Sequence, residues 1–450
     1  MGEPLSLRGA TVLVCGARFA GQAATRVLLA RGAHVLLSDR DRSGGTQALL
    51  DAGAVFLGAL ERLPDGVSLV VTSPGFPPHH PLLVDALAGG IEVLGEVEFA
   101  WRLRGPDAAV WLAVTGTNGK TTTVRMLESI LQTAGLRALA VGNVGVSVID
   151  AVTSTEPYDV LAVELSSYQL HWSSTITPAA GAILNLAEDH LDWHGSMDAY
   201  TSAKTKVWRS AVAVGNLDDP VLALLLDRLP GHRGFTLGEP HPGEYGVRAG
   251  MLVDARGTDL LPVADVRPAG AHNVANALAA AALAADYADA GSVARGLRDF
   301  IPDAHRNQYL LTVGGAAYVD DSKATNPHAA RASMLAYQPI VWVAGGQLKG
   351  AAVDDLVAEV APRLAGVVLL GVDRAIIADA VRRHAPEIPV IEVATDDDGA
   401  MLEVVRAAAG LARPGDTVLL APAGASYDMF ADYAARGRAF ESAARELGRA

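Results

Sequence analysis

The chain has 450 residues, of which 50% are hydrophobic and 19% charged, a composition typical of a globular protein of about three domains. Its 36 basic and 50 acidic residues give a net charge of −14, which argues against nucleic acid or an anionic membrane surface as the main partner. The apolar segments are shorter than the ~20 residues of a membrane span, the N-terminus has no signal-like region, and the single cysteine cannot form an internal disulfide. We therefore expect a cytoplasmic protein.

The first predicted elements form a βαβ unit. A strand at 10–15 leads through a glycine turn into a helix at 22–31 and a second strand at 33–37, and Asp39 follows where a Rossmann fold binds a ribose. Arg18 replaces the middle glycine of G-x-G-x-x-G, and its side chain would obstruct the approach of a pyrophosphate. These residues alone leave three readings open: a dinucleotide site, a modified nucleotide site, or a structural βαβ unit.

Apolar strands alternate with helices along the rest of the chain, which predicts three α/β domains. A further strand runs into the loop Ser73-Pro74-Gly75, a position where doubly wound sheets bind ligands. The composition changes near Gly95, and His305-Arg306 lies near a second boundary. Later strands are predicted at 109–114, 161–165, 182–186, 317–319, 340–344, 367–370, 390–393 and 418–421. The predicted domains are 1–95, 96–302 and 303–450.

The strongest single motif is the segment TGTNGKTT at 115–122, which lies between a predicted strand and a predicted helix. Backbone amides of such a turn bind phosphate oxygens, with the helix dipole behind them. Lys120 would reach the β- and γ-phosphates, and the Thr121 hydroxyl would ligate Mg²⁺. Val114 stands where the strict pattern has glycine, so the motif is a variant P-loop.

Glu164 and His190 each follow an apolar strand, where α/β proteins collect their ligand sites. A carboxylate and an imidazole near a P-loop suit a divalent metal, although each residue alone could equally be a polar loop residue or a cap. Lys204 and Lys206 lie on a predicted helix at 197–208, and two lysines at this spacing are usually solvated. The third domain offers polar loops at 320–327, 345–350 and 422–428, which could bind a small zwitterion or could simply be turns.

Taken together and in this order, these motifs resemble the Mur ligase family over nearly the whole chain. The resemblance is carried by 115–122, Glu164 to Ser167, Glu188 to His190, and His272-Asn273 with Asn276. His305-Arg306 adds to it, and the loops at 321–326 and 422–426 resemble the branch of the family that adds D-glutamate. The resemblance implies a Rossmann-like N-terminal domain, a P-loop ATPase domain and a Rossmann-like C-terminal domain.

The implied activity is ATP-dependent addition of D-glutamate to UDP-N-acetylmuramoyl-L-alanine through an acyl phosphate, by a monomer of the cytoplasmic stage of peptidoglycan synthesis. The resemblance implies UDP contacts for Phe19, Ala20, Asp39, Ser73, Gly75 and Asn143. It implies ATP contacts for Gly116, Thr117, Asn118, Gly119, Lys120, Thr121, Thr122, Asn276 and Arg306. D-glutamate would contact Lys323, Thr325, Lys349, Ser426 and Tyr433.

The same resemblance implies two Mg²⁺ ions held by Thr121, Glu164, His190 and Lys204, with Lys204 carbamylated by CO₂; Lys206 keeps its solvated reading. Catalysis would rest on Lys120, Glu164, His190, Lys204 and Arg306.

Several alternatives stay open at this point. One is simple ATPase or kinase activity, which predicts nucleotide turnover that does not require an amino acid. A different Mur ligase or a folylpolyglutamate synthase would share the P-loop and the lysine, and the third-domain motifs separate them from the D-glutamate branch. A related ligase could take L-glutamate. A non-catalytic nucleotide-binding regulator would keep the P-loop and could lose metal ligands. A dehydrogenase using the first βαβ unit is disfavoured by Arg18.

Overall fold

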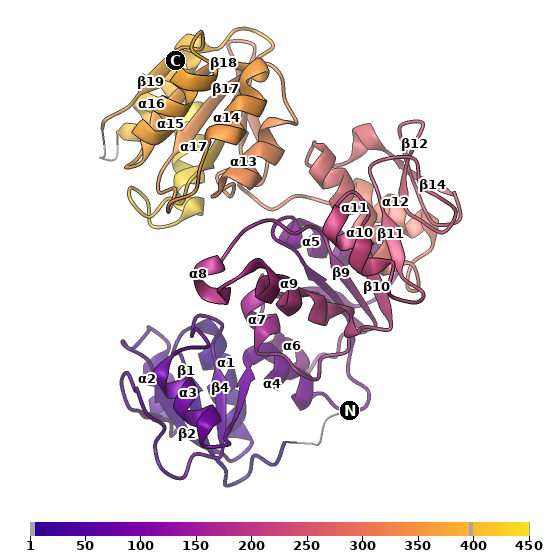
Figure 1. Cartoon of the computed structure of the whole chain (residues 1–450), viewed down its shortest axis with the longest axis vertical. Coiled ribbons are helices and arrows are strands. Elements are labelled where there is room, and N and C mark those ends of the chain that lie inside the picture. The colour runs from indigo at the N-terminus through magenta and orange to yellow at the C-terminus, as the bar shows by residue number, and fades with distance from the viewer. Residues whose placement is uncertain (1–4, 396–398, 450) are drawn as a thin grey trace. The chain divides into compact units, whose positions relative to one another are not determined.

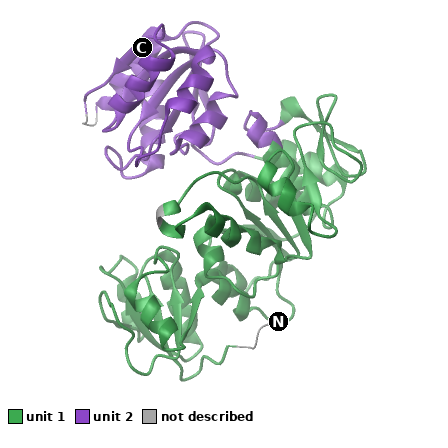
Figure 2. Cartoon of the chain, viewed as in Figure 1, with its two compact units in different colours: residues 1–265, 275–300 green, residues 266–274, 301–450 purple. Residues whose placement is uncertain are grey.

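The computed structural model describes residues 5–395 and 399–449, which form two compact units (Figure 2). Unit 1 comprises the chain up to 265 together with 275–300, and unit 2 comprises 266–274 and the chain from 301 onward. Unit 1 contains two parallel sheets and unit 2 one mostly parallel sheet, all flanked by helices (Figure 1), which confirms the predicted α/β class. The division at 95/96 and 302/303 stays a prediction.

The first sheet of unit 1 has five parallel strands in the order β3-β2-β1-β4-β5. Its strands are β1 (Thr11–Cys15), β2 (His34–Ser38), β3 (Val55–Phe56), β4 (Leu69–Thr72) and β5 (Glu92–Gly95). Its helices are α1 (Phe19–Ala30), α2 (Thr46–Asp51) and α3 (Pro81–Ala88). α1 begins three residues before the predicted helix start at 22. From β1 the chain adds β2 and β3 on one side and then β4 and β5 on the other, so the strand order reverses between β1 and β4. A switch point of this kind opens a crevice in which α/β proteins bind ligands.

The second sheet has six parallel strands in the order β11-β10-β9-β6-β8-β7. Its strands are β6 (Val110–Thr115), β7 (Ala138–Gly142), β8 (Val160–Glu164), β9 (Ala180–Ile183), β10 (Val212–Asn216) and β11 (Arg233–Phe235). The helices are α4 (Glu96–Leu103), α5 (Lys120–Thr133), α6 (Val148–Val152), α7 (Ser167–His171), α8 (Leu191–His194), α9 (Met197–Thr205) and α10 (Pro220–Leu226). The chain closes α9 with a 3₁₀ turn at Lys206–Arg209. β6 and β8 are buried on both faces, as their continuous apolar sequences predict.

A small antiparallel sheet and two helices complete unit 1. The sheet contains β12 (Gly246–Arg248), β13 (Met251–Val253) and β14 (Asp259–Pro262). α11 (Ala271–Ala284) begins in unit 2 and continues into unit 1, and α12 (Ala290–Asp299) packs on α5. The Ser129 hydroxyl of α5 donates to the Gly296 carbonyl oxygen (2.7 Å), and a side chain at Gly296 would collide with the Ile130 backbone.

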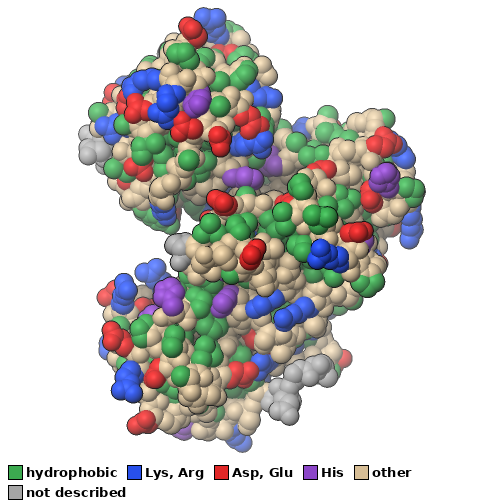
Figure 3. Space-filling model, viewed as in Figure 1, with side chains coloured by type: hydrophobic (Ala, Val, Ile, Leu, Met, Phe, Trp, Pro, Cys, Tyr) green, Lys and Arg blue, Asp and Glu red, His purple; other side chains and the backbone are tan. Residues whose placement is uncertain are grey.

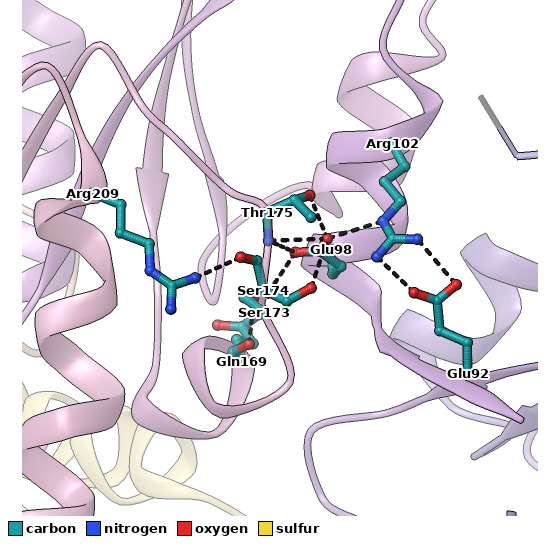
Figure 4. Close-up of polar contacts among 8 residues, drawn as sticks. All are labelled: Glu92, Glu98, Arg102, Gln169, Ser173, Ser174, Thr175 and Arg209. Atoms are coloured by element: carbon teal, nitrogen blue, oxygen red, sulfur yellow. Dashed lines mark hydrogen bonds and ion pairs between the residues drawn. The ribbon is translucent and has the colours of Figure 1, made fainter. Parts of the chain in front are cut away.

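A buried polar network fastens the first sheet to the second (Figure 4). Glu98 of α4 is fully buried and accepts hydrogen bonds from the Thr175 amide and hydroxyl, the Ser174 amide and the Arg102 Nε. Burial alone would raise the pKa of the Glu98 carboxyl, but these donors outweigh it and lower that pKa. Arg102 also pairs with both Glu92 carboxylate oxygens (2.8 and 3.0 Å). The crevice at the switch point of the first sheet is thereby held at a fixed place beside the second sheet.

Unit 2 contains a six-stranded sheet in the order β15-β16-β20-β17-β18-β19, parallel except for the β15–β16 hairpin. Its strands are β15 (Gln308–Val313), β16 (Ala316–Asp320), β17 (Ile340–Gly345), β18 (Leu364–Leu370), β19 (Val390–Glu392) and β20 (Thr417–Ala423). Its helices are α13 (Pro327–Met334), α14 (Asp354–Val360), α15 (Arg374–His384), α16 (Ala400–Leu411) and α17 (Tyr433–Leu447). Apolar clusters on the two faces of the sheet form its core.

Among the helices of residues 5–395 and 399–449, none combines the length and the apolar composition that crossing a membrane requires. On the face shown in Figure 3, acidic and basic side chains are interspersed among apolar and other side chains.

Candidate functional site

The P-loop segment connects β6 to α5, as the sequence predicts, although α5 starts at Lys120 rather than near Thr122. Gly119 precedes the helix with φ 85°, a left-handed conformation that favours glycine. A Cβ at Gly119 would also collide with Asn276 Oδ1, so the buried Asn276 lies directly against the loop. The structure therefore brings Asn276, which is 157 positions away in sequence, beside the predicted phosphate site.

Two lysines donate to the same carbonyl of this loop. Lys120 Nζ donates to the carbonyl oxygens of Gly116 (2.9 Å) and Thr117 (2.8 Å). Lys204 Nζ donates to the Gly116 carbonyl oxygen as well (2.8 Å) and approaches the Thr115 hydroxyl (3.5 Å). The predicted ATP lysine and the lysine that the resemblance singles out thus share one acceptor.

Lys204 is 2% exposed, and the oxygens within hydrogen-bonding distance of its ammonium are a carbonyl and a hydroxyl, both uncharged. Burial, followed by the positive charge of Lys120, lowers the pKa of Lys204 well below its usual value; Asp189 and Glu164 act in the opposite direction. A buried amine of lowered pKa spends more time neutral, and the neutral amine is the nucleophilic form.

A short polar chain joins the P-loop to its neighbour strands. The Thr121 hydroxyl donates to Glu164 Oε2 (2.8 Å), and Asn143 Nδ2 donates to Glu164 Oε1 (2.9 Å). Glu164 is 2% exposed at the end of β8, and Asn143 directly follows β7. Parallel strands end at the same sheet edge, and for this reason three residues far apart in sequence meet here.

Two residues that sequence reasoning missed hold the P-loop in place. Asn185 accepts from the Asn118 amide (2.8 Å) and donates to the Asn118 carbonyl oxygen (3.1 Å). The Tyr200 hydroxyl hydrogen-bonds the Thr117 hydroxyl (2.9 Å), and the Tyr200 ring lies 4.6 Å from Lys204 Nζ. Tyr200 precedes Lys204 by one helical turn on α9, and that i,i+4 spacing is the one sequence signal of its position.

His190 lies at the N-terminus of α8 with φ 54°, and its side chain is 44% exposed. Its ring is 4.7 Å from the Tyr168 ring of α7, and Nε2 is 3.4 Å from an Asp189 carboxylate oxygen. Among the described residues, no three His, Cys, Asp or Glu side chains are arranged to hold a metal ion. A metal site here would therefore need further oxygen ligands beyond these residue types.

All six residues predicted to contact UDP line one cavity of about 670 Å³ in unit 1. Phe19, Ala20, Asp39, Ser73 and Gly75 come from the switch point of the first sheet, and Asn143 comes from the second sheet. The Asp39 carboxylate accepts from the Ala17 and Arg40 amides (2.7 Å each) and so shapes the turn.

The cavity has three further lining residues that bear on its function. Arg18 precedes α1, is exposed and lines the cavity. Glu96 and Gln169, which sequence reasoning missed, also line it. Glu96 is buried and accepts from the Ser147 hydroxyl (2.8 Å), and burial raises the pKa of its carboxyl.

The prediction that the Lys206 side chain extends freely into solvent is wrong. Its Nζ donates to the carbonyl oxygens of Leu170 (2.9 Å) and His171 (2.6 Å), the last residues of α7. The Leu170 carbonyl oxygen also accepts from the Ser173 amide (3.1 Å), and a cation at this helix end interacts favourably with the helix dipole. Lys204 lies on α9 and Lys206 begins the 3₁₀ turn that follows it, and both ammonium groups donate to backbone carbonyls.

In unit 2, the residues predicted to contact D-glutamate lie on loops that follow parallel strands and at the start of α17. Lys323 Nζ lies 3.8 Å from the centre of the Tyr433 ring, and the Thr325 amide donates to the Lys323 carbonyl oxygen (2.8 Å). Lys349 adopts φ 53°, and Ser426 is buried. Reciprocal backbone hydrogen bonds between Gln347 and Ala425 (2.8 Å each) join the loops that carry these two residues.

The segment around Arg306 in unit 2 is held by buried acidic residues. The neighbouring His305 has φ 64°, and its Nδ1 is 2.6 Å from an oxygen of the fully buried Asp320. Asp321 accepts from the Asn307 amide (3.1 Å). Burial raises the pKa of the Asp321 carboxyl to about 6, although Ser333, Asn307 and the charge of Arg306 oppose the shift.

Comparison with protein families gives two matches. A family profile described as the Mur ligase middle domain matches residues 114–284, and one described as the Mur ligase, glutamate ligase domain, matches residues 305–424.

Curated relatives resemble the chain over nearly its full length. It is 51% identical to the UDP-N-acetylmuramoylalanine--D-glutamate ligase of Streptomyces coelicolor, with 99% of this chain and 100% of the relative covered. It is 53% identical to the ligase of the same name from Thermobifida fusca, with 98% and 100% covered.

Solved structures share the fold at lower identity. The UDP-N-acetylmuramate-alanine ligase MurC of Thermotoga maritima matches with a TM-score of 0.62 at 19% identity, covering 97% of this chain and 99% of the other. MurF of Acinetobacter baumannii matches with a TM-score of 0.62 at 19% identity, covering 93% and 91%.

Proposed function

The chain belongs to the Mur ligase family, and we propose that it joins D-glutamate to UDP-N-acetylmuramoyl-L-alanine at the expense of ATP, with release of ADP and phosphate. One structural observation carries the proposal. Asn143 lines the cavity proposed for the UDP substrate and donates to Glu164, which in turn accepts from Thr121 of the P-loop. The proposed carboxylate acceptor and the proposed γ-phosphate donor therefore have adjoining sites in one compact unit.

The proposed reaction has two steps. The carboxylate of the alanyl residue attacks the γ-phosphorus of ATP, and the bond to the bridging oxygen breaks to release ADP and leave an acyl phosphate. The amine of D-glutamate then attacks the acyl carbon, phosphate leaves, and the amine loses its proton. Both reactants of the first step are anions, so cationic groups must offset their repulsion. Lys120 of the P-loop would supply one of these positive charges, and Arg306 is the second cation that the family resemblance implies.

The oxygen-rich end of the P-loop fits a magnesium site. Thr121 and Glu164 present a hydroxyl and a buried carboxylate 2.8 Å apart, and the other carboxylate oxygen meets a neutral amide rather than a cation. Oxygen ligands of this kind are those that Mg²⁺ prefers. We propose that Thr121, Glu164, His190 and a carbamylated Lys204 hold two Mg²⁺ ions, which when bound would supply positive charge to the phosphate groups.

Carbamylation of Lys204 would turn its buried cation into an anion. The amine is buried and lies near Lys120, and both features disfavour its protonated form; its two hydrogen-bond acceptors are uncharged, so no carboxylate pairs with it there. Reaction with CO₂ forms a C–N bond and releases one proton, leaving a carboxylate-like group. The positive charge of Lys120 disfavours a protonated Lys204, but it would attract the negative charge of the carbamate.

The remaining parts of the proposal follow from the family resemblance. D-glutamate would bind at Lys323, Thr325, Lys349, Ser426 and Tyr433. The protein would be a cytoplasmic monomer with domains 1–95, 96–302 and 303–450. Closure of the third domain over the acyl phosphate would protect it from water.

Phosphate release tests the proposal. The assay contains ATP, Mg²⁺ and UDP-N-acetylmuramoyl-L-alanine, with D-glutamate, L-glutamate, other amino acids or none added in parallel. We expect release that depends on D-glutamate. Release with a different amino acid would retain the ligase mechanism and refute the assignment of the amino-acid site, and no release with any of them would refute the enzyme.

A further inference from the structure

Arg436 of α17 is a buried cation that neither the P-loop nor the cavity uses. It is 1% exposed, although α17 also carries arginines that reach solvent. Its guanidinium donates four hydrogen bonds, all to uncharged oxygens: Nε to the Ser322 hydroxyl (3.0 Å), Nη2 to the Ser322 carbonyl (2.9 Å), and Nη1 to the carbonyls of Gly424 (3.0 Å) and Gly345 (3.4 Å).

The acceptors belong to three separate chain segments: the loops that follow β16 and β20, and Gly345 at the end of β17, where the third loop begins. Each loop also carries residues proposed to contact D-glutamate. Ser322 directly precedes Lys323, Gly424 lies two residues before Ser426, and Gly345 begins the loop that reaches Lys349. A single side chain therefore contacts the backbone of every loop in the proposed amino-acid site.

The same cluster fixes the start of α17. The Ser322 hydroxyl, which accepts from Arg436, donates to the Tyr433 carbonyl oxygen (2.7 Å). Tyr433 carries the ring against which Lys323 Nζ lies at 3.8 Å. Arg436, Ser322 and Tyr433 thus form a continuous connection from the helix to the lysine.

The loop after β17 is built closely around the guanidinium. Gly346 has φ 109°, and a Cβ there would collide with the Ala425 carbonyl oxygen and lie 3.2 Å from Arg436 Nη1. Glycine at this position permits the close approach of three chain segments. The cluster is therefore a packed assembly rather than an arginine that merely covers a surface.

Arginine suits this position because its planar group has five donors in a fixed fork and stays charged. Burial lowers the pKa of Arg436 to about 10, with Asp428 and Asp320 acting in the opposite direction, so the group remains a cation at neutral pH. A lysine would present one ammonium on a flexible stem and could not reach acceptors on three loops at once.

We propose that Arg436 is a positioning residue for the amino-acid substrate: it holds the three loops and Tyr433 in the arrangement that binds D-glutamate. The inference rests on the proposed function. It predicts that loss of Arg436 weakens the use of D-glutamate while the use of ATP and of the UDP substrate is largely retained. The P-loop and the cavity proposed for those substrates lie in unit 1, and Arg306 is the one proposed ATP contact in unit 2.

The test measures kcat and KM for all three substrates in the full-length wild type and in Arg436→Lys and Arg436→Met. We expect the KM for D-glutamate to rise at least about tenfold in both variants, equivalent to about 1.4 kcal/mol, with less change for the other two substrates. Arg438→Met is the matched control, because Arg438 is an exposed arginine on the same helix, and it should behave as wild type. An unchanged KM for D-glutamate, or equal losses for all three substrates, would overturn the inference.

Ser322→Ala keeps the test decisive if the Arg436 variants do not fold. It removes one acceptor of Arg436 and the donor to Tyr433, and we expect a smaller rise in the D-glutamate KM, about threefold, with a folded protein. A wild-type KM in this variant would contradict the inference. If the wild type itself released no phosphate in response to D-glutamate, the proposed function would fall and the inference with it, an outcome distinct from altered variants of an active enzyme.

Discussion

Among the residues that the structure describes, two of the lysine and arginine side chains are buried, Lys204 in unit 1 and Arg436 in unit 2. Both donate to uncharged oxygens rather than to carboxylates. Lys204 has one close acceptor and one distant one, whereas Arg436 has four acceptors from three loops. Burial lowers the pKa of both, well below its usual value for Lys204 and to about 10 for Arg436.

The difference separates a reactive cation from a structural one. A lysine with few acceptors can lose its proton, and the neutral amine can then react with CO₂. An arginine keeps its charge under all ordinary conditions. Burying it is therefore strongly unfavourable unless its N–H donors all find hydrogen-bond acceptors. The comparison predicts that substitutions at the two positions affect different steps of the reaction and have different effects on stability.

The largest effect is expected for Lys204→Ala. Without the lysine no carbamate can form, and formation of the acyl phosphate should fall by at least about 100-fold. Hydroxylamine trapping of the acyl phosphate, without D-glutamate, measures this step directly. Acetate should restore part of the activity, and chloride or formate less. Wild-type trapping in Lys204→Ala would eliminate the carbamate proposal.

The same trapping assay applied to Arg436→Met gives the contrasting result. Because Arg436 is proposed to act on the amino-acid site alone, the yield of trapped acyl phosphate should remain close to that of wild type. A loss as large as that of Lys204→Ala would erase the distinction between the two cations.

For the free energy of unfolding we expect the reverse order, with a larger loss on substitution of Arg436 than on substitution of Lys204. Arg436→Met leaves three buried carbonyls without their donor, and we expect a loss of about 3 kcal/mol in the free energy of unfolding. Lys204→Met removes a buried polar group with one close acceptor together with its desolvation cost, so we expect a change within about 1 kcal/mol of zero. Chemical denaturation of both variants measures the difference. A larger loss at Lys204 than at Arg436 would contradict the division into reactive and structural roles.

Asp321 extends the comparison to a half-buried acidic side chain. Burial raises its pKa from the usual 3.8 to about 6, so the folded protein binds more protons than the unfolded chain between these two values. Its contribution to stability is therefore present at low pH and is lost as the pH rises through about 4 to 6. The melting temperature of Asp321→Asn, relative to wild type, should rise across this window and then level off. A difference that is constant from pH 4 to 7 would be inconsistent with the raised pKa.

The sequence predicted the features that depend on local pattern. Continuous apolar strands predicted the parallel sheets, and the P-loop segment predicted the turn between β6 and α5. The residues missed are those whose position depends on contacts between distant segments. Arg436 lies 114 positions from Ser322, and in sequence it does not differ from the exposed Arg438 two residues later. Asn185 and Tyr200 likewise reach the P-loop only once the sheet has assembled.

The smallest effect is expected for Lys206→Met, which also serves as the control for substitutions at Lys204. Lys206 lies two residues from Lys204, and its ammonium donates to the carbonyl oxygens of Leu170 and His171 at the end of α7. Lys206→Met should cost about 1 kcal/mol of stability, from lost hydrogen bonds and a lost interaction with the helix dipole. Its yield of trapped acyl phosphate should remain near that of wild type, because no proposed ligand contacts Lys206. If both lysine variants lost this step equally, the loss would reflect disturbed packing of α9 and the 3₁₀ turn after it, and the proposal that the Lys204 amine itself is required would be refuted.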